Sequence, residues 1–351
     1  MPDDWLIRRT KPHGTHFGRA IPAFIPNGDY QLTTIDAYAD GAINCWDFLD
    51  LPSFKSKVAS GWVVTKPPEG KVVSVFDLGF ATVAEQRWIL EPDDIIRRVE
   101  NAVRHLNPAL NNLFKLPKSA LKSSAIVIEV SDISEARKAG LLTGLKSSVR
   151  VIEARDPMPC LSLDPTILGK KVPIFERQDH ELFRLKQWFV FADGSSRIGP
   201  DGRIEELEAH IEFARSGLLC TQAPDGALIE VGDLGAFLAS QSQWFVRIDD
   251  RIAEIRDHLS CLRGGKSAIV RCREAFDAYQ ASPSEQARSE LREAYLAVPQ
   301  HLRHFCGDMD DKDYRIRAIL FDSGARSEPP LMPQPHSSVL NLIKSFWRRL
   351  K

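Results

Sequence analysis

The pattern of apolar and polar positions along this chain occurs twice, at a constant offset. Residues 59–79 read ASGWVVTKPPEGKVVSVFDLG, and residues 215–235 read RSGLLCTQAPDGALIEVGDLG. Nine of these 21 positions are identical, and they include the turn residues of both stretches. Two unrelated segments could share turn residues, but they would not share the order of turns and the apolar period over about 85 residues. The sequence therefore predicts a tandem duplication of one domain.

The match continues on both sides of these stretches. Upstream, YADG at residues 38–41 corresponds to FADG at residues 191–194, and downstream Trp88 corresponds to Trp244. Further along, apolar residues fall at i, i+3, i+7 and i+10 in both copies, the spacing of one face of a helix. These residues are Ile96, Val99, Val103 and Leu106 in the first copy and Ile252, Ile255, Leu259 and Leu262 in the second.

Each copy predicts strands connected by short turns, together with two helices. In the first copy we expect strands at 30–38, 42–46, 62–66 and 71–76, a strand ending near Trp88, and helices at 51–60 and from Asp93 onward. Hairpin-length connections favour antiparallel pairing. The predicted fold class is therefore α+β, with two tandem copies of a mainly antiparallel sheet domain that carries packed helices.

The same patterns divide the chain into segments. We expect a first repeat domain at 1–110, a connecting strand-helix-strand segment at 111–165, and a second repeat domain with C-terminal helices at 166–322. A Pro/Ser-rich linker follows at 323–336, and a basic amphipathic helix at 337–351.

Composition and charge narrow the functional classes. The 351 residues are 43% hydrophobic and 26% charged, as in ordinary globular proteins, and the formal net charge of −1 gives no general attraction to nucleic acid. The six cysteines are scattered without a CxxC pair, which argues against a disulfide framework and a four-thiolate zinc site. Without an apolar leader or a membrane-length apolar run, a cytoplasmic location is expected.

The densest group of polar, chemically active residues lies at 301–321, HLRHFCGDMDDKDYRIRAILF. One interpretation is a polar turn that leads into a strand at 314–321. The other is a divalent metal ion held by Asp308, Asp310 and Asp313 with His301 or His304, because carboxylates and imidazoles are metal ligands. The second copy of the repeat ends before this segment, and the first copy has no counterpart to it.

The residues NCWDFLD at 44–50 offer a second candidate site. Cys45 could be a reactive thiol, but no basic neighbour is visible in the sequence to lower its pKa, so core packing is the preferred interpretation for Cys45 and Trp46. The second copy has Ile198 and Gly199 at the corresponding positions. The two copies could therefore contact different partners at this surface.

The C-terminal segment predicts an amphipathic helix with a basic polar face. Its apolar positions recur at helical spacing, and no acidic residue is present. A helix of this length is marginal in isolation, so we expect it to fold on the body of the protein, in a partner's groove or on an anionic membrane surface. The residues expected to contact a partner are Leu342, Ile343, Phe346, Trp347, Arg348, Arg349 and Leu350.

Three stretches, YADGAINCW, SGWVVTKPPEG and VPQHLRHFCGDMDDKDYRIRAIL, resemble an uncharacterised bacterial family of small cytosolic proteins. The resemblance covers most of the chain in pieces, and the second copy lacks the Cys-Trp and Trp-Val-Val residues of these motifs. It implies an accessory protein of the kind seen near toxin-immunity or phage-defence genes. It implies no activity.

These observations lead to two hypotheses. The leading one is a non-enzymatic protein-interaction protein that needs no cofactor and that binds a partner protein through its duplicated domains and C-terminal helix, because the duplication carries no duplicated polar constellation. The alternative is a metal-dependent hydrolase or nuclease that uses Asp308, Asp310 and Asp313. The sequence has no GxSxG, Walker A or HExxH motif that would indicate another enzyme class.

Overall fold

The computed structural model describes residues 5–11, 14–108, 167, 169–200, 202–307 and 312–321, with residues 5–17 described by their backbone only. The predicted connecting segment at 111–165, the linker at 323–336 and the helix at 337–351 lie outside the described residues.

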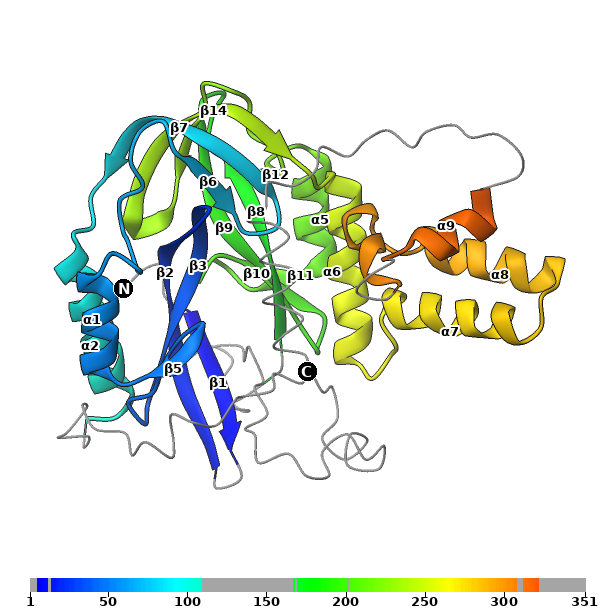
Figure 1. Ribbon diagram of the computed structural model, residues 1–351, viewed down its shortest axis with the longest axis horizontal. Helices are drawn as coiled ribbons and strands as arrows, with labels where there is room; N and C mark the ends of the chain where they lie inside the picture. Colours follow the sequence, from blue (N-terminus) through cyan, green and yellow to red (C-terminus); the bar gives the residue numbers. More distant parts are fainter. Residues whose placement is uncertain are drawn as a thin grey trace.

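Repeat 1 (residues 14–106) is a sheet whose strands are joined by short connections, and two helices pack on it (Figure 1). The strand β1 (Trp5–Lys11) precedes repeat 1 and pairs with the first strand of the repeat, β2. The elements of repeat 1 are β2 (Gly14–Asn27), β3 (Asp29–Tyr38), β4 (Ile43–Cys45), β5 (Asp47–Leu49), α1 (Leu51–Ala59), β6 (Val72–Val75), β7 (Gly79–Trp88) and α2 (Pro92–Leu106). Strands β2, β3 and β4 form antiparallel pairs, β6 pairs with β3 in parallel, and β7 returns antiparallel beside β6.

Repeat 2 (residues 169–262) has the same order of elements and the same pairing. Its elements are β8 (Gly169–Arg177), β9 (Leu182–Phe191), β10 (Ser195–Ile198), β11 (Glu205–Glu206), α5 (Leu207–Arg215), β12 (Leu219–Cys220), β13 (Leu228–Glu230), η2 (Gly232–Leu234), β14 (Gly235–Trp244) and α6 (Ile248–Leu262). Its β8, β9 and β10 form antiparallel pairs, β13 runs parallel to β9, and β14 is antiparallel to β13. The predicted duplication of a mainly antiparallel α+β domain is confirmed.

The two repeats join edge to edge through β7 and β14. Gly79 pairs with Trp244, and Trp88 pairs with Gly235. The first residue of each strand thus pairs with the last residue of the other, so the register is symmetric between the two copies. The flanking backbone bonds are also matched: Ile89 N donates to Leu234 O at 3.0 Å and Phe245 N donates to Leu78 O at 2.8 Å. The strands of both copies thus belong to one 14-stranded sheet in the described part of the chain, related by an approximate twofold axis.

The repeated Asp-Leu-Gly sequence forms the turns at this junction. Leu78 and Leu234 are buried in a hydrophobic core that both repeats share. A Cβ atom on Gly235 would lie 2.4 Å from the carbonyl oxygen of Arg87, and one on Gly79 would lie 2.1 Å from that of Gln243. Glycine is therefore required twice because each turn touches the backbone of the opposite repeat.

The segment at 62–66 forms a single bridge rather than the predicted strand. Val64 pairs with Phe24 alone, and the two prolines that follow remove backbone donors that a longer strand would need. Repeat 2 shows the same contact as the short strand β12, in which Cys220 pairs with Phe175.

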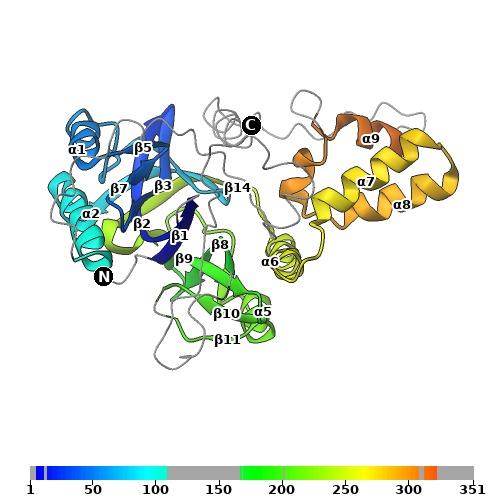
Figure 2. The ribbon, with the colours of Figure 1, turned by 90° about the horizontal axis from the view of Figure 1, so that it is seen from below.

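A helical unit (residues 267–321) follows repeat 2 and has a core of its own. It contains α7 (Ala268–Ala281), α8 (Glu285–Leu296), the 3-10 helix η3 (Gln300–Phe305) and α9 (Tyr314–Phe321). Figure 2 shows this unit projecting beside α6, away from repeat 1. The strand predicted at 314–321 is a helix, because Ile316 and Leu320, one helical turn apart, are both buried in this core.

None of the helices that the structure describes is both long enough and apolar enough to cross a lipid bilayer.

Replacing Gly235 by Ala tests the junction. We expect Gly226→Ala, at a positive φ of 85° with open space around it, to lower the free energy of unfolding by about 1–2 kcal/mol. Gly235→Ala should cost a further 1–3 kcal/mol or so, because its Cβ must displace the backbone of β7. Urea unfolding of both variants measures the difference. Equal losses would contradict the close approach.

Candidate functional site

A cluster of charged side chains lies where α6 meets the helical unit. Asp250, Glu254 and Asp257 occupy positions i, i+4 and i+7 of α6 and therefore share one face of the helix. Each accepts a hydrogen bond from the helical unit. Asp250 accepts from the backbone N of Gln300 at 2.9 Å, Glu254 from Nε2 of His301 at 2.9 Å, and Asp257 from the backbone N of Ala268 at 2.8 Å.

Arg251 extends the cluster to repeat 1. Its guanidinium donates two hydrogen bonds of 3.1 Å to the Asp77 carboxylate and one of 2.6 Å to Glu254. The Arg251 side chain is fully buried, whereas Asp77 is 44% exposed. Asp77 belongs to repeat 1, Arg251 and Glu254 to repeat 2, and His301 to the helical unit. The cluster is therefore a charged junction of all three parts.

The junction sets the ionisation of Glu254. Burial alone would raise its pKa, but the charge of Arg251 and the hydrogen bond from His301 outweigh that effect and lower the pKa to about 2. Burial alone would lower the pKa of Arg251, but the carboxylates of Asp77 and Glu254 outweigh that effect and raise it. Both groups are therefore held in their charged forms at neutral pH.

Three of these side chains also satisfy the distances of a metal site. The ligand atoms of Asp77, Glu254 and His301 lie within 4.8 Å of one another. The Arg251 guanidinium, however, is hydrogen-bonded to both carboxylates, so a divalent cation would have to displace a buried positive charge. The geometry thus fits an internal ion-pair network better than it fits a metal centre.

Of the predicted metal residues, the structure describes His301, His304 and Asp313, and these three do not form a three-ligand group. His301 is bound to Glu254, while Asp313 accepts a hydrogen bond from the Tyr295 hydroxyl at 2.6 Å. Burial lowers the pKa of His304 to about 4, and its Nε2 has no hydrogen-bond partner. Asp308 and Asp310 lie outside the described residues. So do the predicted partner-binding residues Leu342, Ile343, Phe346, Trp347, Arg348, Arg349 and Leu350.

The two aromatic motifs singled out in the sequence meet on repeat 1. The rings of Trp46 and Trp62 pack edge to face with centroids 5.6 Å apart, and Nζ of Lys57 lies 3.7 Å above the centre of the Trp62 ring. Trp46 adopts a left-handed backbone, with φ of 64°, where repeat 2 has Gly199 at 72°. The neighbouring Cys45 is buried, as the packing interpretation predicts.

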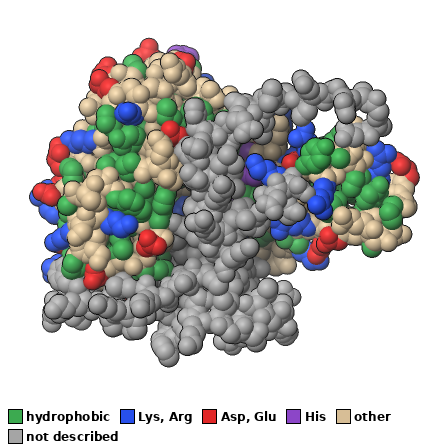
Figure 3. Space-filling view, in the orientation of Figure 1, with side chains coloured by type: hydrophobic (Ala, Val, Ile, Leu, Met, Phe, Trp, Pro, Cys, Tyr) green, Lys and Arg blue, Asp and Glu red, His purple; other side chains and the backbone are tan. Residues whose placement is uncertain are grey.

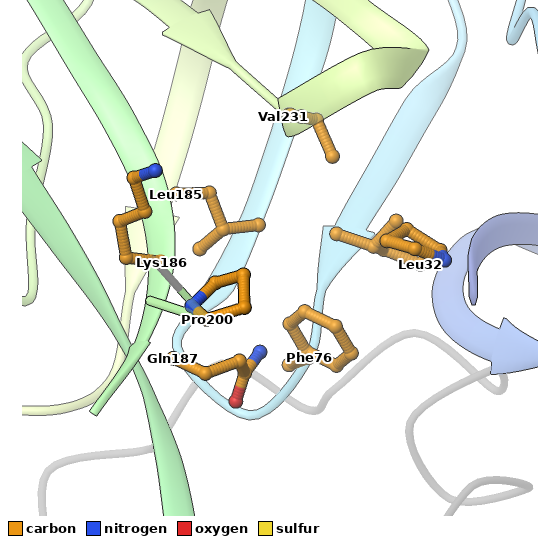
Figure 4. A pocket seen from close by; sticks show the side chains of 9 residues that line it. Leu32, Phe76, Leu185, Lys186, Gln187, Pro200 and Val231 are labelled. Atoms are coloured by element: carbon orange, nitrogen blue, oxygen red, sulfur yellow. The ribbon is translucent and has the colours of Figure 1, made fainter. Parts of the chain in front are cut away.

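A small apolar cavity lies between the two repeats. Figure 4 shows Leu32 and Phe76 of repeat 1 facing Leu185 and Val231 of repeat 2 across it. Its volume of about 30 Å³ holds a water molecule, whereas sites for small molecules usually measure several hundred Å³. The cavity is thus a packing defect at the junction.

A larger, open groove of about 430 Å³ runs along α2 of repeat 1. It is lined by Ile89, Leu90, Asp94, Arg97, Arg98, Asn101 and Asp233. Arg98 forms a 2.7 Å ion pair with Asp233, the counterpart in repeat 2 of Asp77. The groove therefore occupies the position on repeat 1 that the charged junction occupies on repeat 2. The repeated sequence around Asp77 and Asp233 pointed to both the groove on α2 and the charged junction on α6. The repeat alone did not show that each aspartate contacts an arginine of the opposite repeat.

Comparison with known families agrees with this architecture. The family described as Domain of unknown function (DUF7638) matches residues 8–110 and again residues 163–266, which together make up more than half of the chain. The protein belongs to this family and carries two copies of its domain. A second family, Domain of unknown function (DUF7639), matches residues 267–341 and so includes the helical unit. Neither a search of curated proteins nor a search of solved structures found a match.

The lowered pKa of Glu254 predicts acid sensitivity. Because its folded pKa lies below the unfolded value, the stabilisation is complete above about pH 4.5 and is lost as the pH falls toward 2. The full contribution is about 3 kcal/mol. Glu254→Gln should lower stability at pH 7 by about 3–5 kcal/mol and flatten this part of the pH profile, since it leaves Arg251 buried with one carboxylate.

Urea unfolding between pH 2.5 and 7 measures both effects. Glu208→Gln removes an exposed carboxylate of α5 and serves as the control for the change in net charge. A Glu254→Gln profile parallel to that of the wild type would contradict the junction.

A metal-dependent hydrolase stays a prediction that elemental analysis tests. We expect the purified full chain to contain less than stoichiometric Mg, Mn or Zn, and its unfolding temperature to be unchanged when these ions are added, because Arg251 occupies the described carboxylate pair. One bound ion per chain would support the hydrolase, and Asp308→Asn with Asp310→Asn would then locate that ion.

Proposed function

We propose that the protein is a non-enzymatic interaction and accessory protein that binds a partner protein through its duplicated domains and its C-terminal segment. The observation that carries this proposal is the unequal use of two equivalent helices. In repeat 2, α6 docks the helical unit through Asp250, Glu254 and Asp257. In repeat 1, the equivalent face of α2 has an open groove.

The divergence of the repeats supports the same proposal. Their turns, pairing and core match, whereas the surface around Trp46 and Trp62 does not, because repeat 2 has Gly199 and Leu218 there. Phe76, with φ of 50°, likewise stands where repeat 2 has Gly232 at 47°. A bulky residue in the left-handed region costs about 1–2 kcal/mol and is often kept for function. Phe76 lines the cavity between the repeats, so the surface that is particular to repeat 1 is the one around Trp46 and Trp62.

The family that the sequence resembles suggests a cellular setting for this proposal. This setting is an accessory role beside toxin-immunity or phage-defence systems, as the resemblance implies. The genes that neighbour this one test this role. Partners encoded next to the gene would support it, and neighbours of general metabolism would count against it.

Deleting residues 336–351 tests the contribution of the C-terminal segment. We expect the shortened chain to lose co-purification with its partner from native cells while keeping its unfolding transition, because the deleted residues carry the predicted apolar face. Trp347→Ala in the full chain provides a matched single change. Unchanged co-purification would remove this segment from the binding surface. Sedimentation with anionic vesicles that is lost at high salt would indicate a membrane surface instead.

A further inference from the structure

We propose that Cys272 and Cys306 are a site of reversible oxidation, at which a peroxide converts two hydrogen-bonded thiols into a disulfide. Both cysteines belong to the core of the helical unit, where they are 0% and 1% exposed. Both are free thiols, and their side chains are hydrogen-bonded to each other. This inference goes beyond the proposed function and does not depend on it.

The surrounding backbone holds the two thiols side by side. Cys272 lies in the second turn of α7, and Cys306 directly follows η3. The guanidinium of Arg273, the residue after Cys272, donates to the carbonyl oxygen of Phe305 at 2.6 Å and to that of Cys306 at 3.4 Å. The two sulfurs need to close only the difference between a hydrogen-bond contact and an S–S bond of about 2.05 Å. The fold thus pairs two cysteines that α8 separates in the sequence.

The electrostatic surroundings favour the thiolate of Cys272. The hydrogen bond that the Cys306 thiol donates lowers the pKa of Cys272. The charges of Arg273 and Arg303 lower it further, and these effects together outweigh burial and the charge of Asp313, which raise it. Lys and Arg side chains are also frequent on the face of the helical unit that Figure 3 shows. Because the thiolate is the form that attacks a peroxide, we assign Cys272 as the nucleophile.

A cysteine of repeat 2 shows what burial does without a second thiol. Cys220 lies in β12, and burial raises its pKa to about 11. It is therefore a neutral thiol at pH 7 and reacts slowly with peroxide. Cys220 provides an internal control for the pair in the helical unit.

The oxidation proceeds in two balanced steps. The Cys272 thiolate attacks one oxygen of hydrogen peroxide, the O–O bond breaks, and the departing hydroxide takes up a proton to become water. Cys272 is now a sulfenic acid, oxidised by two electrons, and the peroxide is reduced. The Cys306 sulfur then attacks Sγ of Cys272, the S–O bond breaks, and hydroxide leaves with the Cys306 proton as a second water. Two thiols and one peroxide thus give one disulfide and two waters, and thiol exchange with a reductant reverses the change.

The disulfide would connect the two segments that dock the helical unit on α6. Cys272 follows Ala268 by one helical turn, and the backbone N of Ala268 bonds to Asp257 of α6. Cys306 directly follows η3, whose His301 bonds to α6 as well. A bond between these segments restricts the unfolded chain and so favours the folded, docked unit. Oxidation should therefore strengthen the attachment of the helical unit to repeat 2.

The first experiment treats the reduced full chain with hydrogen peroxide, blocks the remaining thiols in denaturant and maps disulfides by mass spectrometry. We expect a bond between Cys272 and Cys306 that dithiothreitol removes, while Cys220 is recovered as a blocked thiol. Absence of this bond, or oxidation of Cys220 to the same extent, would overturn the inference.

Single variants of the full chain test the two assigned roles. In Cys306→Ser the hydroxyl can still donate to Cys272 but cannot form a disulfide, so the sulfenic acid should accumulate and be trapped by dimedone. In Cys272→Ser the remaining Cys306 should react with peroxide at least about tenfold more slowly. Equal rates in the two variants would contradict Cys272 as the nucleophile, while the mapping of the unaltered chain still decides whether the disulfide forms.

Thermal unfolding tests the consequence for docking. The oxidised chain should unfold at a temperature at least about 5 °C higher than the reduced chain, because the disulfide closes a long loop. Cys272→Ser treated with the same peroxide is the control and should show no rise. An oxidised chain that contains the bond and unfolds at the unchanged temperature would contradict the stabilised attachment.

Discussion

The pairing of β7 with β14 is the constraint on which the rest of the structure depends. It joins the exposed edges of two incomplete sheets, which would otherwise present unpaired backbone groups to solvent. The register requires Gly79 and Gly235 at the points of closest approach and gives the two repeats a common core. Asp77 and Asp233, one residue before the buried leucines, then reach arginines of the opposite repeat. The duplicated unit is thus half of a body, and the chain supplies both halves.

The approximate symmetry does not extend to the two arginines, because Arg98 stands at the position of Glu254 and Arg251 at the position of Ile95. Arg98 keeps a quarter of its side chain exposed, so one carboxylate is enough for it. Arg251 is fully buried and needs two carboxylates, one of which is oriented by His301. Buried ion pairs add little net stability, but removing one partner is costly. The network therefore serves mainly to fix the position of the helical unit on repeat 2.

Because the domain is duplicated, the same helix face can have a different role in each copy. In repeat 2 the face of α6 is used internally, while in repeat 1 the equivalent face keeps a groove. The left-handed residues follow the same division: Trp46 and Phe76 in repeat 1 correspond to glycines in repeat 2. Glycine adopts this conformation at no steric cost, whereas Trp46 and Phe76 adopt it with strain while packing against the shared core. The differences between the copies lie at the surface around Trp46 and Trp62 and also at the junction, where Phe76 lines the small cavity.

The sequence alone determined the duplication, the fold class and most helices, because turn residues and apolar period are local signals that survive divergence. It misassigned residues 314–321, where Ile316 and Leu320 suit a helix only once their neighbours are known. Asp250 lies in the first turn of α6, and its bond from Gln300, 50 residues away, has no signal in the local sequence. Only the tertiary structure could decide that Asp77 meets Arg251 across 174 residues, because no local pattern shows which buried charge an exposed turn will reach.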